Sequence, residues 1–372
     1  SRYPTDVKFV TPMPLSHAGS QGVLMIFRQL FDNQSSTYTY LLASRVGGEA
    51  MIIDPVFERC ERYLTLLNEL DLKLVKAVDT HCHADHITGL GTLRDATRCI
   101  TVMGAKTDVD VVSIRIDEGD TIDIENISMP VLYTPGHTDD SYCFAMSDRV
   151  FTGDTLLIRG TGRTNFQNGS AKAAYHSLFE KVLKLPDDTQ VFPGHDYKGD
   201  TVSSIAEERA FNPRLQVSSA DEYAEIMDNL NLPNPKMMDV AVPANLSIGQ
   251  SLSDDPAIAD ATLAPDEANT CLGDVDMLFI DLREANERQR DGVIPGSLHA
   301  PYNALETAIR PGGLLNAVAA QTGKSLLLYC AYGECSALAM KALKEAGFAG
   351  VSHLGGGIDA WKENGCPVEY LT

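Results

Sequence analysis

The stretch His81-Cys82-His83-Ala84-Asp85-His86 places three imidazoles and one carboxylate within six consecutive residues. Three neutral nitrogen donors and one hard oxygen donor suit a borderline transition metal such as zinc or iron. The residues just before it, 74–78, are mostly apolar and include two valines, as in a buried strand. The donors therefore follow the carboxyl end of a strand, where open α/β sheets place their sites. We expect a metal site here; the alternative is a polar cluster of hydrogen-bonded histidines.

The composition is that of a globular protein and bears on the class of partner. The chain has 372 residues, of which 44% are apolar and 22% charged, and this length favours two domains. The formal net charge of −21 argues against nucleic acid, because phosphate binding needs clustered Lys and Arg. We find no run of about 18 apolar residues, so we expect no membrane span. An anionic small molecule would need its own local cations.

The cysteines bear on the compartment. Eight are present, and their spacing is not that of a paired disulfide framework: Cys60, Cys82, Cys99, Cys143, Cys271, Cys330, Cys335 and Cys366. In a chain of this size such cysteines are typical of free thiols in a reducing compartment. We see no secretory apolar segment at the start. We therefore expect the cytoplasm, with an organelle matrix as second choice. Because the chain begins at Ser1 rather than Met, the question of whether a leader has been removed stays open.

Two α/β regions follow one another along the chain, with a polar stretch between them. In the first, we expect strands at 22–27, 39–43, 50–54, 74–78, 127–132, 142–146 and 149–152, and helices at 59–70, 171–185 and 203–211. Residues 247–255 are small, polar and glycine-containing, as in a linker. In the second region, we expect strands at 277–281 and 325–329 and a helix at 336–346. We therefore expect domains at 1–250 and 261–372, joined by a linker at 251–260.

Three later loops of the first region offer further metal donors. His137, Asp154 and His195 each follow a strand-like stretch and each stand directly after a glycine. A glycine there lets the backbone approach a shared centre closely. Each short motif alone would be weak evidence. Together with the first cluster, they make four ligand loops at strand ends in one domain, which is strong evidence for a metal centre.

The order His-x-His-x-Asp-His, followed by His, Asp and His, resembles the metallo-β-lactamase superfamily over about residues 7–245. This resemblance implies an αββα sandwich with the metal at the sheet edges. Two branches compete. Glyoxalase II-like hydrolases use all the donors to hold two metals and activate hydroxide on a thioester. Persulfide dioxygenases of the ethylmalonic-encephalopathy-protein type hold one iron with two histidines and an aspartate.

Segments 154–167, 195–199 and 232–239 resemble the dioxygenase branch. The resemblance implies one Fe(II) per chain, bound by His81, His137 and Asp154, with positions left open for oxygen and a substrate sulfur. It places four further donor residues around these ligands, where they orient the ligands and bound water: His83, Asp85, His86 and His195. One departure is Thr161, where many relatives carry cysteine, and it puts only a peripheral thiol role in doubt.

The usual substrate of this family is glutathione persulfide, whose two carboxylates need cations in an otherwise acidic protein. The candidates for binding glutathione are Arg163, Tyr197 and Lys198, which lie in the family segments near the metal. Arg159 and Arg214 are further candidates. The alternative is that these side chains are solvated surface charges.

A second chemical motif runs from the apolar residues 326–329 through a short loop, which begins at Cys330, into a helix. A cysteine there lies among backbone amides at a helix N-terminus, which stabilise a thiolate and can bind an anion such as a persulfide. The alternative is that Cys330 is a small buried hydrophobe. Segments 281–284, 292–297 and 353–361 then resemble the rhodanese family in order and spacing, over about residues 260–372.

The rhodanese resemblance implies an α/β domain with a parallel sheet and a sulfurtransferase in which Cys330 is the catalytic, sulfur-carrying nucleophile. Glu334 and Cys335 depart from many rhodanese loops, which carry an arginine where Cys335 stands. Losing that cation and adding a carboxylate should weaken binding of a dianionic donor. Cys335 is then either a resolving thiol or a spectator.

Both resemblances together are to a persulfide dioxygenase–rhodanese fusion protein. They imply an enzyme that oxidises glutathione persulfide with O2 and water to sulfite and glutathione. The second domain would move sulfane sulfur between thiosulfate and glutathione, and tethering raises the effective concentration of the shared intermediate. The expected partners are glutathione persulfide, glutathione, O2, and thiosulfate or sulfite, with no nucleic acid and no membrane. Whether the chain forms a homo-oligomer is left open.

Two other functions remain in competition with this one. The first is a dinuclear thioester hydrolase of glyoxalase II type, because every donor of a second metal is present. The second is a dioxygenase whose rhodanese module is inactive and only binds or carries sulfane sulfur. The preferred thiol, the direction of sulfur flow and the interdomain geometry are open.

Overall fold

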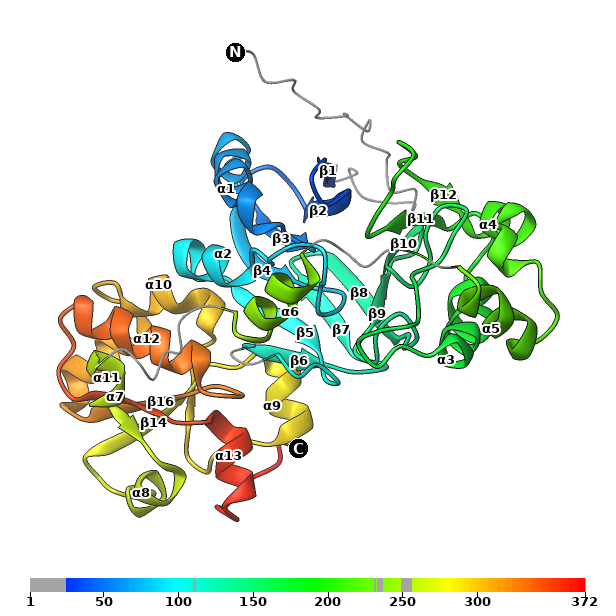
Figure 1. Cartoon of the computed structure of the whole chain (residues 1–372). Coiled ribbons are helices and arrows are strands. Elements are labelled where there is room, and N and C mark those ends of the chain that lie inside the picture. The colour runs from blue at the N-terminus through cyan, green and yellow to red at the C-terminus, as the bar shows by residue number, and fades with distance from the viewer. Residues whose placement is uncertain (1–24, 110–111, 231, 233–236, 249–255, 372) are drawn as a thin grey trace. The chain divides into compact units, whose positions relative to one another are not determined.

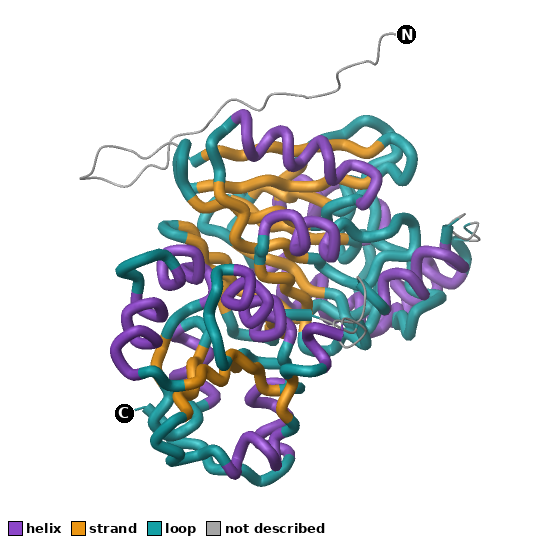
Figure 2. Tube along the Cα trace, turned by 90° about the vertical axis from the view of Figure 1, so that its left-hand side faces the viewer, coloured by secondary structure: helices purple, strands orange, loops and turns teal. Residues whose placement is uncertain are grey.

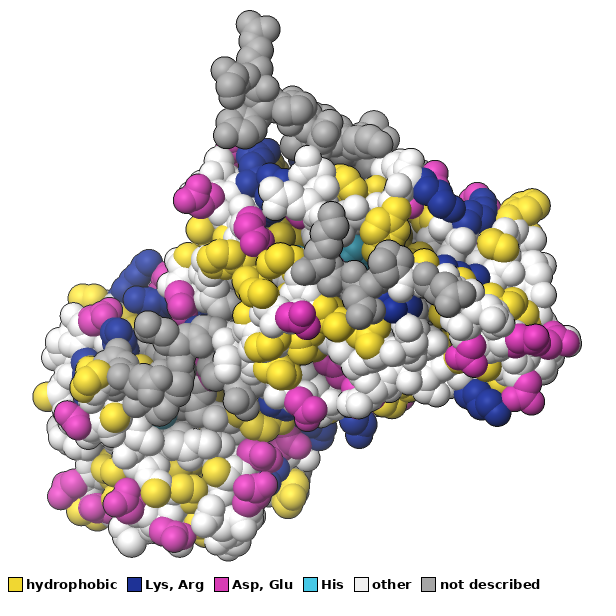
Figure 3. All heavy atoms as spheres, in the orientation of Figure 1, with side chains coloured by type: hydrophobic (Ala, Val, Ile, Leu, Met, Phe, Trp, Pro, Cys, Tyr) yellow, Lys and Arg dark blue, Asp and Glu magenta, His cyan; other side chains and the backbone are white. Residues whose placement is uncertain are grey.

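The computed structural model describes residues 25–109, 112–230, 232, 237–248 and 256–371. These residues fall into two compact units (Figure 1). One unit extends to Ile248 and the other begins at Pro256, and residues 112–114 group with the second. Among the described residues, no helix is long and apolar enough to cross a bilayer. On the face drawn in Figure 3, acidic and basic side chains are interspersed.

The first unit contains two six-stranded sheets. The first sheet consists, in spatial order, of β1 (Ile26–Asp32), β2 (Thr37–Ala43), β3 (Glu49–Ile53), β4 (Lys73–Val78), β5 (Ile100–Gly104) and β6 (Ile114–Ile116). The second consists of β12 (Ser203–Ser204), β11 (Gln190–Pro193), β10 (Arg149–Gly153), β9 (Tyr142–Ala145), β8 (Ile127–Tyr133) and β7 (Thr121–Ile124).

Aromatic side chains fill the space between the two sheets. The ring centroids of Phe27 and Phe192 are 4.9 Å apart, and those of Tyr40 and Phe151 are 5.0 Å apart. Each pair joins a strand of one sheet to a strand of the other. Such pairs bury large apolar surfaces in offset or edge-to-face contact. The two sheets therefore share one core, as layers of a sandwich (Figure 2).

Helices cover the outer faces of this sandwich. Helices α1 (Cys60–Glu69) and α2 (Leu90–Thr97) lie along the first sheet, where they form the crossovers between parallel strands (Figure 1). Helices α3 (Ala171–His176), α4 (Ile205–Phe211) and α5 (Ala220–Asp228) share a buried apolar cluster with β9 and β10. The expected αββα sandwich is confirmed.

The topology brings four strand ends together. Strands β10 and β11 are parallel, and β8 runs in the same direction because β9 is antiparallel to both β8 and β10. The carboxyl ends of these three strands therefore lie at one edge of the second sheet. Strand β4 contributes its carboxyl end from the first sheet. The loops that follow these four ends carry the predicted metal donors.

The second unit is built on a five-stranded sheet in which each pair of neighbours is parallel. Its strands, in spatial order, are β13 (Thr262–Leu263), β17 (Val351–Leu354), β16 (Ser325–Tyr329), β14 (Met277–Asp281) and β15 (Leu298–His299). Its helices are α7 (Pro256–Ala259), α8 (Pro265–Thr270), α9 (Ala285–Asp291), α10 (Leu305–Ile309), α11 (Leu314–Thr322), α12 (Glu334–Glu345) and α13 (Gly357–Glu363). Trp361, fully buried, packs in its core. This matches the parallel α/β fold expected for the second domain.

Several boundaries differ from the sequence prediction. The strand expected at 22–27 lies partly outside the described residues. The helix expected at 171–185 is α3 followed by a π-helical turn at Ser177–Lys181 and a 3-10 turn at Val182–Lys184. The helix expected at 203–211 begins only at Ile205, after β12. Residues 256–259 form helix α7 with Ile258 buried, so a helix lies inside the range expected for the linker.

Candidate metal centre and cysteine loop

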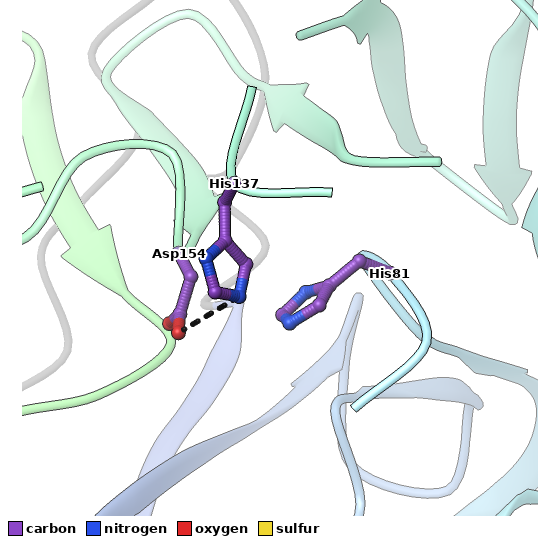
Figure 4. A group of neighbouring side chains, drawn as sticks. All are labelled: His81, His137 and Asp154. Atoms are coloured by element: carbon purple, nitrogen blue, oxygen red, sulfur yellow. Dashed lines mark ion pairs between the residues drawn. The ribbon is translucent and has the colours of Figure 1, made fainter. Parts of the chain in front are cut away.

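Three side chains converge where the loops after β4, β8 and β10 meet. His81, His137 and Asp154 each offer one ligand atom, and these atoms lie within 4.8 Å of one another. Figure 4 shows the two rings and the carboxylate turned toward a common point. Nε2 of His137 is 3.6 Å from Oδ2 of Asp154, and both histidines are buried. The structure therefore brings together the three predicted iron ligands.

Hydrogen bonds on the far side of each ring fix the nitrogen that faces this point. Nδ1 of His137 lies 2.7 Å from the backbone oxygen of Arg163 and must donate to it. Nδ1 of His81 lies 3.0 Å from the Thr80 hydroxyl, which itself donates to Asp54 and so accepts from the ring. In both rings, Nε2 is left with its lone pair.

Electrostatics keep the donors in the states that bind metal. Burial lowers the pKa of His81 well below its usual value, and His83 and His137 lower it further, so the imidazole is neutral. Burial raises the pKa of Asp154, but the positive charge and hydrogen bond of His195 outweigh it and lower the pKa, so the carboxylate is ionised. His81 therefore offers a neutral nitrogen and Asp154 an anionic oxygen.

The glycines before two of the donors are required by the geometry. Gly153, before Asp154, has φ +47°, in the left-handed region that favours glycine. A Cβ on Gly194, before His195, would lie 2.8 Å from Oδ1 of Asp154. A larger residue would therefore be strained at Gly153 and would crowd the Asp154 carboxylate at Gly194.

A chain of hydrogen bonds links His86, Asp85 and His195 to Asp154, one of the three ligands. Oδ2 of Asp85 lies 2.8 Å from Nδ1 of His86 and 2.8 Å from Nε2 of His195. The other ring nitrogen of His195, Nδ1, lies 2.6 Å from Oδ1 of Asp154. Burial lowers the pKa of His195, but Asp154 and Asp85 together raise it well above its usual value. His195 is therefore an imidazolium without a lone pair.

His83 packs beside His81, with ring centroids 4.3 Å apart, but its charge is set by acids behind the site. Nε2 of His83 lies 3.3 Å from Oδ1 of Asp54. Burial lowers the pKa of His83, but Asp54 outweighs it and raises the pKa to about 9. Among the described atoms, His83 Nδ1 and His86 Nε2 are buried without a hydrogen-bond partner. Such nitrogens suit water or a metal ion.

Two residues that shape this site were not predicted. Thr37 Oγ1 lies 3.1 Å from Asp85 Oδ2 and 3.1 Å from His195 Nε2, between the loops. Asn245, at the end of helix α6 (Met238–Leu246), donates to the backbone oxygens of His83 and His86. No local pattern signals Thr37. For Asn245, the hint was a polar residue inside a largely apolar segment.

A cavity of about 230 Å³ lies beside the metal donors, and all five candidate residues for glutathione binding line it. Arg159 is bound by Glu207 and Glu208, so its charge is neutralised. Arg163 donates to Asn165 and lies over the ring of Phe166, 4.7 Å from its centroid. The remaining three candidates in the lining are Tyr197, Lys198 and Arg214.

Among the described residues, no carboxylate forms an ion pair with the guanidinium of Arg214. Its Nη1 donates to the backbone oxygen of Thr161, and burial lowers its pKa, which the Tyr223 hydroxyl partly restores. Thr161, which stands at the position of the expected cysteine, bonds its hydroxyl to that of Tyr223 at 2.8 Å. Tyr197 is exposed and stacks on the ring of His195.

In the second unit, Cys330 follows β16 and is 3% exposed. Its Sγ accepts from the backbone N–H of Gly333 at 3.1 Å and of Ser336 at 3.4 Å. Burial raises the pKa of Cys330, but hydrogen bonds from Cys335, Ser336 and the two backbone amides outweigh it and lower the pKa to about 6. The thiolate expected at this helix N-terminus is therefore favoured at neutral pH.

Comparison with known proteins agrees with both units. Residues 32–195 match the metallo-beta-lactamase superfamily, and residues 264–364 match the rhodanese-like domain. "Persulfide dioxygenase ETHE1, mitochondrial" from Mus musculus is 48% identical over 242 residues, which are 63% of this chain and 93% of that protein. The protein of the same name from Homo sapiens is 47% identical over the same shares.

Solved structures give the same result. The crystal structure of ETHE1 from Myxococcus xanthus is 51% identical, with a TM-score of 0.59, and covers 60% of this chain and 100% of its own. A metallo-beta-lactamase from Staphylococcus aureus covers 90% of this chain and 99% of its own at a TM-score of 0.57, but at 22% identity it shows the fold alone. With these relatives, this chain belongs to the persulfide dioxygenase family of metallo-beta-lactamase-fold proteins and carries a C-terminal rhodanese-like domain.

Proposed function

We propose that domain 1–250 oxidises glutathione persulfide with O2 at one Fe(II) held by His81, His137 and Asp154. The balanced reaction converts glutathione persulfide, O2 and H2O to glutathione, sulfite and two protons. The observation that carries this proposal is the convergence of these three side chains, whose ligand atoms lie within 4.8 Å of one another. His195, a further donor of the motif, has its two ring nitrogens engaged by the carboxylates of Asp85 and Asp154, which favours a mononuclear centre.

The donor set suits iron. Two imidazole nitrogens and one carboxylate oxygen correspond to the facial triad of non-haem Fe(II) oxygenases, which leaves coordination positions open. When bound there, iron supplies the redox chemistry that activates O2 toward a sulfur atom. Zinc lacks that redox chemistry and would serve hydrolysis instead.

The chain's own residues would hold and shield the reacting groups. The hydrogen bond from His195 fixes the rotation of the Asp154 carboxylate, so that Oδ2 remains on the side of His137. The backbone oxygen of Arg163 orients the His137 ring from the cavity wall. Burial of both imidazoles excludes water from the ligands, and outer contacts of this kind tune a metal site strongly.

We infer that the cavity takes the glutathione moiety of the substrate. Its lining includes Asp154 as well as Arg163, Arg214 and Lys198. Each glutathione carboxylate would pair with one of these cations, and the persulfide sulfur would then point toward the metal donors. Arg159 contributes least, because Glu207 and Glu208 already bind its guanidinium.

Two buried histidine nitrogens support a second candidate function, that of a dinuclear thioester hydrolase. His83 Nδ1 and His86 Nε2 are buried and, among the described atoms, lack hydrogen-bond partners. His83, Asp85 and His86 also offer ligand atoms within 4.8 Å of one another. Against this candidate, Oδ2 of Asp85 is already held by hydrogen bonds with His86 and His195.

The decisive experiment is oxygen uptake with glutathione persulfide on metal-quantified protein. We expect uptake that scales with iron, at one iron per chain. The His86→Gln variant should retain that iron, because His86 is not one of the three ligands; a dinuclear centre would instead lose a metal. Two zinc ions per chain with no oxygen uptake would end the proposal.

Arg214→Ala is expected to raise KM for glutathione persulfide by roughly ten- to a hundredfold with little change in kcat. A hydrogen bond to a charged group contributes about 1.5–3 kcal/mol, and that is the free energy of substrate binding that would be lost. The measurement is the initial rate of oxygen uptake against substrate concentration. Arg209→Ala is the matched control, because this exposed arginine pairs with Asp187 and does not line the cavity. An unchanged KM in Arg214→Ala would remove this residue from the substrate site.

We further propose that domain 261–372 moves sulfane sulfur between thiosulfate and glutathione, with Cys330 as the nucleophile. The hydrogen bonds that favour its thiolate support this role. For location we propose the cytoplasm. The mouse and human relatives are named mitochondrial, and an organelle matrix would equally preserve the free thiols.

A further inference from the structure

Three polar side chains connect Cys330 to the edge strand of its sheet. The Cys330 sulfur lies 3.6 Å from Oγ of Ser336, and that oxygen lies 3.3 Å from Nδ1 of His353. The other ring nitrogen of His353, Nε2, lies 2.8 Å from Oγ1 of Thr262. The Thr262 hydroxyl also lies 2.8 Å from the backbone oxygen of Ile258, to which it can donate. These groups form one continuous series of hydrogen bonds, which we call the Cys330 relay.

The fold of the second unit holds the members of this relay in place. Ser336 lies in the first turn of α12, His353 on β17 and Thr262 on β13. Strands β13 and β17 are parallel neighbours, and Thr262 stands opposite His353 in their register. Cys330, Ser336 and His353 are buried. Thr262 is partly exposed on the edge strand, so the relay leads from a buried thiol toward solvent.

Each group between the thiol and solvent can accept one proton while it gives up another. A hydroxyl has one proton and two lone pairs, and a neutral imidazole has one N–H and one lone pair. Burial lowers the pKa of His353 to about 4, so its ring is neutral at physiological pH. The Ser336 hydroxyl also lies 3.0 Å from the backbone oxygen of Gly333, which competes for its proton. Neither hydroxyl nor ring is therefore fixed in a single direction of donation.

We propose that the Cys330 relay carries the proton of the Cys330 thiol to solvent when the thiolate nucleophile forms. The proposal rests on the sulfur-carrying role of Cys330 given above. Ser336 contacts the reacting sulfur itself, whereas His353 and Thr262 act through Ser336 as positioning residues. A thiol that is only 3% exposed thereby gains a route for proton exchange that does not require the loop to open.

Protons balance along the relay. The thiol proton passes to Oγ of Ser336, whose own proton passes to Nδ1 of His353. The proton on Nε2 of His353 then passes to Oγ1 of Thr262, and the former Thr262 proton leaves to water. Each of the three groups ends with as many protons as it had, so no imidazolium remains. Only bonds to hydrogen break and form, and no oxidant or reductant is needed.

The transfer reverses the direction of every hydrogen bond in the relay. Beforehand the donors point away from the sulfur, toward the backbone oxygen of Ile258. Afterwards Thr262 donates to Nε2 of His353, Nδ1 donates to Ser336, and the Ser336 hydroxyl donates to the thiolate. Hydrogen bonds aligned in one direction strengthen one another, so the distant hydroxyl helps to stabilise the thiolate. The nitrogen that carries the His353 proton therefore reports the state of Cys330.

The first test follows alkylation of Cys330 against pH, by mass, in full-length, metal-loaded protein. Thr262→Val removes the last hydroxyl of the relay and retains the branched shape. We expect it to raise the midpoint of the alkylation profile by about half a unit to one unit, the effect of losing one hydrogen bond. Thr262→Ser, which keeps the hydroxyl, should retain the wild-type midpoint. Thr322→Val is the matched control, because this exposed hydroxyl bonds only within its own segment, to the backbone oxygen of Val318 and the N–H of Lys324.

Other titratable groups face the relay and are unchanged in this series. Cys335 and Glu287 influence Cys330, and Lys344 influences His353. Because the Thr262 variants leave all three in place, a moved midpoint reports the hydroxyl. A loss of packing alone would slow or speed alkylation at every pH without moving the midpoint.

The second test reads the tautomer of His353 by NMR of protein labelled with 15N at histidine, with the signal assigned from His353→Gln. We expect the proton on Nε2 below the midpoint of Cys330 and on Nδ1 above it, and no such change in Cys330→Ser. An unchanged midpoint in Thr262→Val, or one tautomer on both sides of the midpoint, would overturn the relay. If the relay behaves as expected but the protein never gains sulfur from thiosulfate, the sulfurtransferase role fails and the relay stands.

Discussion

Asp154→Asn is expected to empty the iron site and to lower persulfide-dependent oxygen uptake by more than the roughly 10- to 100-fold that changes around the ligands typically cause. The carboxylate uses both of its oxygens: Oδ1 binds His195 at 2.6 Å, while Oδ2 faces Nε2 of His137 at 3.6 Å. An amide has the same shape but no charge, and only one of its two terminal atoms accepts. It therefore satisfies either the imidazolium or the metal, never both.

The measurement is iron content together with the rate of oxygen uptake. Asp140→Asn is the matched control, because this buried carboxylate accepts from the backbone of Cys82 and from Thr138 but is not one of the three ligands. It should retain iron. If Asp154→Asn kept one iron and its activity, the proposed ligand set would be wrong.

Local pattern was enough to predict the strands that carry the site. Residues 74–78 are mostly apolar and lead directly into the histidine cluster, and β4 ends at Val78 as expected. The same holds for Cys330, which follows an apolar stretch that forms β16. In both cases the residues before the functional side chain determine the element, so the sequence alone places the loop.

Elements with ambiguous or short patterns were missed. Helix α6 contains Pro243, which normally argues against a helix interior, and its residues are apolar all round. Strand β6 spans only Ile114–Ile116, too short for an alternation to be recognised. Helix α7 follows a polar stretch typical of a linker, yet Ile258 is buried.

The partners of the donors could not be predicted, because they depend on contacts between distant segments. Asn245 reaches the histidine loop from about 160 positions away along the chain. Thr37 enters the same region from the start of β2. Sequence motifs therefore indicated the candidate metal ligands, whereas the raised pKa of His195 followed only from the acids that the fold brings against it.

Cys330→Ser is expected to abolish sulfur transfer from thiosulfate to glutathione and to leave oxygen uptake with preformed glutathione persulfide unchanged. In the proposed transfer, sulfur is carried on this one atom, and serine oxygen cannot form the persulfide. Cys366→Ser is the matched control, because its thiol is distant in sequence from the loop and bonds to the backbone oxygen of Asn364. Thiosulfate-dependent turnover that survived in Cys330→Ser would leave the rhodanese domain as a binding module.

The reactivity of the same thiol should also depend on pH in a specific way. Hydrogen bonds from Cys335, Ser336 and the Gly333 amide outweigh burial and hold the pKa of Cys330 at about 6. Because the thiolate is the nucleophile, the alkylation rate at Cys330, followed by mass, should be constant above pH 7. It should fall about tenfold per pH unit below the midpoint. An ordinary thiol, with a pKa of 9.0, would still gain rate from pH 7 to 9. Ser336→Ala removes the hydroxyl whose hydrogen bond with the Cys330 sulfur lowers this pKa, so it should move the midpoint upward. A wild-type midpoint near 9 would contradict the proposed thiolate.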